Sequence, residues 1–102
     1  TILRNSLDLL MDREFPPDER RKIQDIALAH PDVRAAHDLR TRSSGTRVFI
    51  QLHLELDGNL TLHRAHHIAD EVEAEIKLVF PDAEVMIHQD PAGLVEDHPR
   101  FL

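Results

Sequence analysis

The chain has 102 residues, of which 41% are hydrophobic and 30% charged, with a net charge of -7, eight histidines and no cysteine. This length suits one small folded domain with a single core, and the composition is that of a globular chain. The negative charge argues against nucleic acid as a partner and favours cations, because nucleic acid rewards clustered lysine and arginine. The missing cysteines exclude disulfides and thiolate metal sites.

The first fifteen residues are expected to form a linker. Apolar residues recur among acidic ones at roughly helical spacing, which is typical of a short amphipathic segment leading into a domain. The chain opens at Thr1 rather than at methionine. We therefore expect residues 1–15 to connect the domain to a preceding part of a longer protein.

A helix and a hairpin are predicted next. Two prolines followed by two carboxylates at residues 16–19 favour a helix start, and we expect this helix over residues 17–30. Alternation of apolar and polar residues predicts strands over residues 33–42 and 46–56. A Ser-Ser-Gly turn at residues 43–45 joins them, and its glycine is suited to a positive φ.

A longer helix and a last strand complete the pattern. Thr61 is a suitable N-cap, and apolar residues at three- and four-residue steps from Leu62 to Val79 predict an amphipathic helix. The strand is expected over residues 83–91, and a flexible tail over residues 92–102.

The order helix, strand, strand, helix, strand predicts an α+β fold over residues 16–91. Two helices on one face of a three-stranded sheet form a two-layer sandwich. This α-β-β-α-β order matches a ferredoxin-like fold that lacks its first strand.

Three strand histidines and an aspartate are candidate metal ligands. His88 and Asp90 are two residues apart on the last strand and therefore share a face. A three-residue hairpin loop places His37 and His53 on one sheet face, offset by one pair, although a bulge at Gly45 would alter this register. Diagonal neighbours lie roughly 7–8 Å apart, within bridging reach of one metal ion. The apolar residues of the second strand pack on the helices, so this histidine face points outward.

The long helix adds His66, which reaches the site only if the helix start approaches the sheet rim in this subunit or in a partner. Its neighbours His63 and His67 are better suited to a solvated helix face. Phe49 and Met86 fall on or near the outward sheet face, and exposed apolar side chains there are typical of a dimer surface. Imidazole and carboxylate ligands without thiols favour zinc, with iron, cobalt or nickel as alternatives.

Catalytic motifs are missing from the sequence. There is no glycine-rich phosphate loop and no HExxH helix, and the serines of the hairpin turn have no evident base. An enzyme is therefore not predicted.

Two motifs, HDLRTR at residues 37–42 and IHQDP at residues 87–91, are together specific. With the strand over residues 49–55 between them, they resemble the cytoplasmic C-terminal domain of the cation diffusion facilitators. The resemblance is to the bacterial zinc and ferrous-iron efflux branch and covers roughly residues 8–91.

The resemblance implies a metallochaperone-like domain on the cytoplasmic face of the bacterial inner membrane, attached to a membrane domain that exchanges a divalent cation for protons. It implies a homodimer with a regulatory, zinc-sensing role and no small-molecule substrate in this domain. It also implies a binuclear Zn(II) site at His37, His53, His88 and Asp90, with His66 contributing, although other divalent cations stay open. The alternative function is a free-standing soluble metallochaperone or metal sensor of the same fold.

Overall fold

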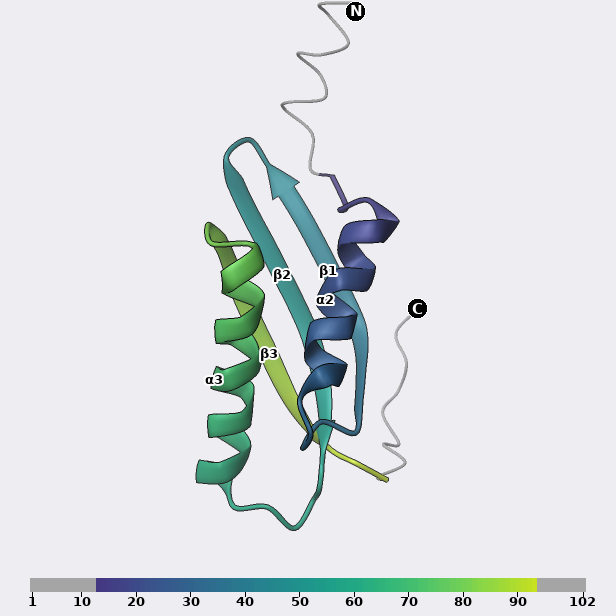
Figure 1. The fold of residues 1–102 in the computed structure, drawn as a ribbon, viewed down its shortest axis with the longest axis vertical. Helices are drawn as coiled ribbons and strands as arrows, with labels where there is room; N and C mark the ends of the chain where they lie inside the picture. The colour runs from purple at the N-terminus through teal and green to yellow at the C-terminus, as the bar shows by residue number, and fades with distance from the viewer. Residues whose placement is uncertain (1–12, 94–102) are drawn as a thin grey trace, which may run out of the picture.

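The computed structural model describes residues 13–93, so residues 1–12 of the predicted linker and residues 94–102 of the predicted tail lie outside the described part of the chain. The elements are α2 (Pro17–Ala29), β1 (Ala35–Ser44), β2 (Arg47–Leu56), α3 (Leu62–Val79) and β3 (Ala83–Pro91). Their order confirms the prediction (Figure 1). No helix within residues 13–93 is long and apolar enough to cross a membrane.

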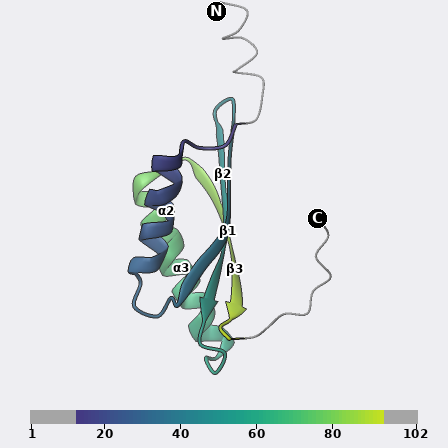
Figure 2. The same ribbon diagram turned by 90° about the vertical axis from the view of Figure 1, so that its right-hand side faces the viewer.

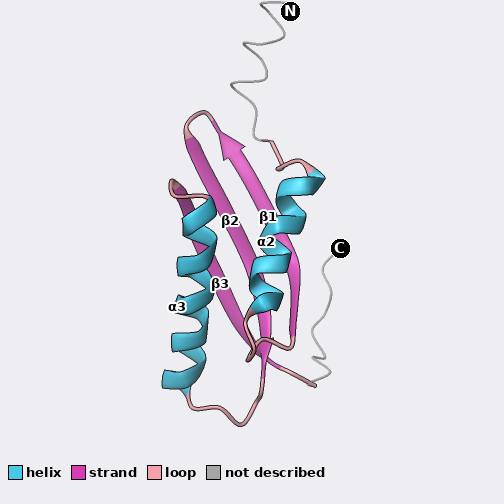
Figure 3. Cartoon of the chain, in the orientation of Figure 1, coloured by secondary structure: helices cyan, strands magenta, loops and turns pink. Residues whose placement is uncertain are grey.

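The molecule is a two-layer α+β sandwich, as predicted. The sheet has the order β1-β2-β3, in which β1 and β2 are antiparallel and β2 and β3 are parallel. Both helices cover the same face of this sheet, which is clearest where the sheet is seen edge-on (Figure 2). The parallel pair requires a crossover between β2 and β3, and α3 supplies it (Figure 3). No described residues cover the other face of the sheet.

Local sequence explains where both helices begin. Helix α2 starts at Pro17, whose missing N–H costs nothing in the first turn, and Asp18 and Glu19 lie at the positive end of the helix dipole. Helix α3 starts after Thr61, whose hydroxyl accepts a hydrogen bond from the Arg64 backbone N–H at 3.1 Å. The predicted N-cap is therefore confirmed.

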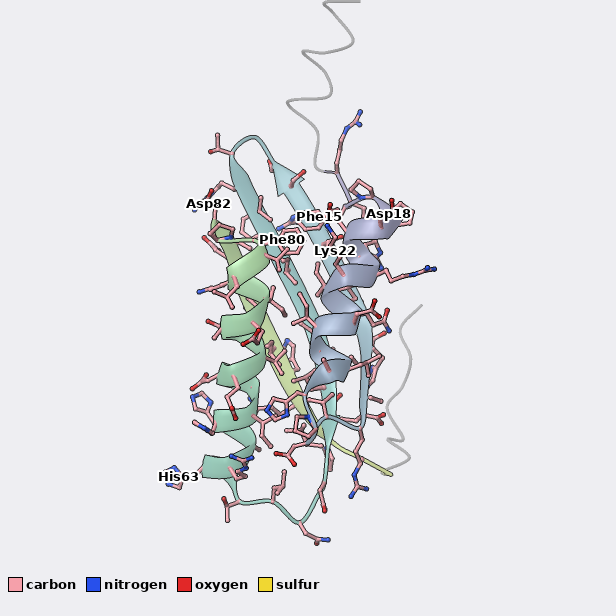
Figure 4. The ribbon with its side chains drawn as sticks, viewed as in Figure 1. Phe15, Asp18, Lys22, His63, Phe80 and Asp82 are labelled. Carbon is pink, nitrogen blue, oxygen red and sulfur yellow. The ribbon has the colours of Figure 1, made fainter. Side chains whose placement is uncertain are left out.

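The core lies between the helices and the sheet. Its largest fully buried side chains come from the inner sides of the two helices and from the even-numbered residues of β2: Ile23, Ile50, Leu52, Leu54, Ile68, Val72 and Ile76. At one end of this layer the rings of Phe15 and Phe80 lie with their centroids 5.5 Å apart, between the start of α2 and the end of α3 (Figure 4). The predicted apolar stripe was wrong at both ends of α3, since Leu62 is 86% and Val79 46% exposed.

The predicted hairpin was wrong in its loop and in its register: a loop over residues 43–45 places Arg42 opposite Thr46, but Arg42 pairs with Phe49. Ser44 pairs with Arg47, so the loop has only two residues, and Gly45 adopts the predicted positive φ of 60°. A change of one residue inverts the faces of one strand relative to the other. Continued without interruption, this register would place His37 opposite Leu54, on the core side.

A β-bulge in β1 inverts the faces of this strand a second time and returns His37 to the outward face. The register shifts between His37 and Arg40, and Asp38 adopts a φ of 53°. The extra residue on β1 turns the chain by one side-chain position, which is the usual effect of a bulge. As a result Thr41 and Ala36 both face the core, and His37 faces outward directly opposite His53.

Helix α2 satisfies backbone groups on both sides of this bulge. Gln24 Nε2 donates to the Ala36 carbonyl at 3.1 Å, and Arg20 Nη2 donates to the Leu39 carbonyl at 3.0 Å. A bulge interrupts the strand ladder, so carbonyl groups beside it need other partners. The packing of α2 on β1 thus supports the irregular geometry.

Candidate metal centre

Three histidines lie side by side across the uncovered face of the sheet. His53 of β2 pairs with His37 of β1 on one side and with His88 of β3 on the other. The His37 and His53 ring centroids are 5.5 Å apart and those of His53 and His88 are 4.6 Å apart, with ring planes inclined by only 17° and 16°. Directly opposed residues repeat at about the strand separation of roughly 4.7–4.9 Å, which explains this stacking. We call these three histidines together with Asp90 the histidine row.

Asp90 connects two members of the row. Its Oδ2 atom lies 2.9 Å from His53 Nδ1 and 3.8 Å from His37 Nε2. Because an ionised carboxylate only accepts hydrogen bonds, Nδ1 of His53 is the donor, and in the neutral ring Nε2 is then the nitrogen with a lone pair. The side chains of His53 and Asp90 are only 28% and 23% exposed, so this contact is partly shielded from solvent.

The donor types of the row fit zinc, because imidazole and carboxylate are usual zinc ligands. The observed rotamers are not yet a closed ligand set: within residues 13–93 no three histidine or carboxylate side chains are arranged to hold a metal ion. The rings lie parallel rather than converging on one point. Side-chain rotation or a ligand from a second chain is therefore needed to complete a centre here.

Two further polar side chains contact the row. Asp38 Oδ2 lies 3.3 Å from His37 Nδ1, and Gln51 Nε2 lies 3.4 Å from His88 Nε2. Neither contact was predicted from the sequence. Gln51 precedes His53 by two residues in a strand, so the period of two already placed it on the same face. Asp38 belongs to the bulge. The available signal was the spacing of the apolar residues Ala36 and Leu39: residues three apart can share one face of a strand only if the strand is irregular between them.

His66 does not join the row within one chain. It lies on α3, which covers the opposite face of the sheet, and its side chain is 71% exposed with Nε2 3.4 Å from Asp70 Oδ2. The structure therefore brings together four of the five predicted ligands and leaves the fifth facing solvent. As metal ligands, all five remain predictions.

Comparison with known proteins gives the family. The family model ZT_dimer, described as "Cation efflux protein, cytoplasmic domain", matches residues 15–92. The chain is 54% identical over 96 residues to the cation-efflux pump FieF of Cronobacter sakazakii, covering 94% of this chain and 31% of the relative. It is 55% identical over 86 residues to FieF of Shewanella oneidensis, covering 84% of this chain and 29% of the relative. The chain thus spans about a third of the length of these curated relatives.

Solved structures agree with the sequence relatives. The zinc form of the zinc transporter CzrB superposes with a TM-score of 0.73 at 32% identity, covering 88% of this chain and 100% of that one. The metal-bound C-terminal domain of the CzcD transporter from Thermotoga maritima gives a TM-score of 0.71 at 32% identity, covering 78% of this chain and 93% of that one. The residues matched by the family model, 15–92, include both helices and all three strands of the sandwich. The chain belongs to the family of cytoplasmic domains of cation efflux proteins.

Proposed function

We propose that this chain is the zinc-sensing, regulatory and dimerisation domain of a divalent cation/proton antiporter that exports Zn(II), or another divalent cation such as Fe(II), from the cytoplasm. The observation that carries the proposal is the histidine row, which gathers three imidazoles and a carboxylate from three strands onto an open sheet face. The relatives' names refer to cation efflux and zinc transport, and their greater length leaves room for a membrane domain at the bacterial inner membrane.

In this proposal His37, His53, His88 and Asp90 hold a binuclear zinc centre, and His66 reaches it from the second chain of a homodimer. His66 is exposed near the start of α3, so it is accessible to a partner chain whose sheet face meets this one beside that end of the helix. A divalent cation, when bound, supplies positive charge and a link between ligands of different strands or chains.

The sheet face also has the character of a dimer surface. Met86 is 58% exposed on it. Phe49 lies on the same face, and the guanidinium carbons of Arg42 and Arg47 lie 5.0 and 5.9 Å from its ring centroid. Two chains of net charge -7 repel each other at short range. Charge neutralisation at the histidine row lowers this repulsion, so the angle or distance between two chains would depend on metal. Such a change biases a transporter to which both copies are attached.

A zinc titration with and without the row tests the site. We expect His53→Ala and Asp90→Asn each to lower the number of zinc ions bound per chain or to weaken binding at least tenfold, because each removes a donor from the centre of the row. Glu84→Gln is the matched control: Glu84 is also an outward carboxylate of β3, but it lies 3.8 Å from Arg47, away from the row. Unchanged stoichiometry and affinity in both row variants would contradict the site.

The dimer surface is tested separately by sedimentation. Met86→Glu places a charge on the exposed sheet face and should lower the dimer fraction at a fixed chain concentration. Leu78→Glu is the control, because Leu78 is 76% exposed on α3, in the helix layer. A dimer that tolerates Met86→Glu but not Leu78→Glu would place the interface on the helices instead.

A further inference from the structure

A second group of metal-binding side chains lies on α3, on the other side of the sheet from the histidine row. We propose that His63, His67 and Glu71 form a separate site for a divalent transition-metal cation, with His30 positioning the carboxylate. These residues follow one another at four-residue steps along the helix. Side chains at i and i+4 are neighbours on a helix surface, so all three lie along one stripe.

In the observed rotamers His63, His67 and Glu71 do not form a closed ligand set, so His63 must rotate to complete the site. The spacing of the other two side chains suits coordination. His67 Nε2 lies 3.4 Å from Glu71 Oε1. Ligand atoms bound at about 2.0–2.1 Å around a tetrahedral zinc ion are separated by about 3.3–3.4 Å, so these two donors already have the separation of two ligands of one ion. Pairs of histidines at i and i+4 are a recurrent zinc-binding arrangement on helices. His63 is exposed one turn earlier and points away from the sheet (Figure 4), so its rotation toward His67 meets no buried neighbour.

His30 fixes the carboxylate from the end of α2. Its Nδ1 accepts a hydrogen bond from the Asp32 backbone N–H at 3.1 Å, so the neutral ring carries its proton on Nε2. That nitrogen lies 3.4 Å from Glu71 Oε1 and donates to it. His30 cannot use Nε2 as a metal ligand while it keeps this tautomer, so it is a positioning residue. Its side chain is only 13% exposed, and it therefore holds Glu71 from a fixed place.

The charge and chemistry of the helix define the ligand class. Helix α3 carries four carboxylates, Asp70, Glu71, Glu73 and Glu75, against the two cations Arg64 and Lys77, which favours a cation at its surface. Imidazole and carboxylate donors without a thiol suit Zn(II), Ni(II) or Cu(II) better than calcium or magnesium. Because the site is exposed, water fills the remaining coordination positions, and we expect the bound ion to exchange readily.

A zinc competition titration against a chromophoric chelator tests this site on the whole 102-residue chain. The double variant His63→Gln, His67→Gln should bind one zinc ion fewer per chain than the parent, and Glu71→Gln should weaken one class of site at least tenfold. Glu75→Gln is the matched control, a carboxylate one turn further along the same helix, and should bind like the parent. Equal stoichiometry and affinity in the parent and in the double variant would overturn the proposal.

Zinc bound at the helix site can be distinguished from zinc bound at the histidine row. A variant with His53→Ala should keep the zinc ion that the double variant loses, and combining the three changes should remove both classes of site. If His53→Ala has no effect while the double variant loses zinc, the row fails and the helix site stands. If zinc leaves the side-chain NMR signals of His63 and His67 unshifted, the helix site is wrong even where the stoichiometry changes.

Discussion

The β-bulge at Asp38 is the feature on which the histidine row depends, and it can be tested by one substitution. Asp38 adopts a φ of 53°, a left-handed conformation that costs an L residue roughly 1–2 kcal/mol and that aspartate tolerates better than most. Asp38→Val places a β-branched side chain there, for which this conformation is a strong outlier. We expect the variant to lose about 1–2 kcal/mol of unfolding free energy.

The backbone conformation, not the lost contact, should account for most of this change. The Asp38 carboxylate lies 3.3 Å from His37 Nδ1, but their side chains are 65% and 42% exposed, and an exposed pair contributes only about 0–1 kcal/mol. The chain could instead lose the bulge, but His37 would then turn toward the core. Burying an imidazole without a partner costs about 1–3 kcal/mol, so a variant that lost the bulge would also be destabilised.

Thermal unfolding at fixed chain concentration in excess chelator is the assay, because bound metal or dimerisation would otherwise shift the midpoint. For a domain of this size a loss of about 1–2 kcal/mol lowers Tm by about 4–16 °C. Asp38→Asn and Asp38→Gly are the controls, since both residues accept a positive φ, and each should stay within about 0.5 kcal/mol of the parent. If Asp38→Val is as stable as Asp38→Asn, the bulge does not constrain this position and the reasoning is wrong.

Three further predictions concern the scaffold, each measured by chemical denaturation in chelator. Leu54→Ala removes a side chain with 0% exposure from the centre of β2 and should cost about 2–5 kcal/mol, whereas Met86→Ala, on the exposed face, should cost far less in the monomer. Thr61→Ala removes the hydroxyl that caps α3 and should cost about 1 kcal/mol, while Thr61→Ser should restore most of it. Gly45→Ala should cost about 1 kcal/mol because of the φ of 60° alone, since no atom lies within 4 Å of the added carbon; Gly45→Asn should cost less.

Much of the fold could be predicted because its signals are local. The proline and carboxylates before α2, the hydroxyl of Thr61, and the alternation along β2 each act within a few residues, and the structure confirms them. The α-β-β-α-β order followed from these signals. The apolar stripe of α3 was less well predicted at its ends, because the exposure of Leu62 and Val79 depends on how far the helix extends beyond the sheet.

The sequence by itself determined which residues are candidate ligands: three strand histidines and Asp90 on an outward face, without a cysteine among them. Only the tertiary structure decided how they meet. The predicted hairpin had two errors: its loop was one residue too long, and it lacked the bulge at Asp38. The two errors cancelled for the sheet face on which His37 lies. They did not cancel for its partner, because His37 pairs directly with His53 and is not offset by one pair. The physical reason is that strand faces alternate with a period of two, so each one-residue irregularity inverts them, and partners from α2 made the bulge possible. Long-range packing of this kind also separated His66 from the row by placing its helix on the opposite face of the sheet.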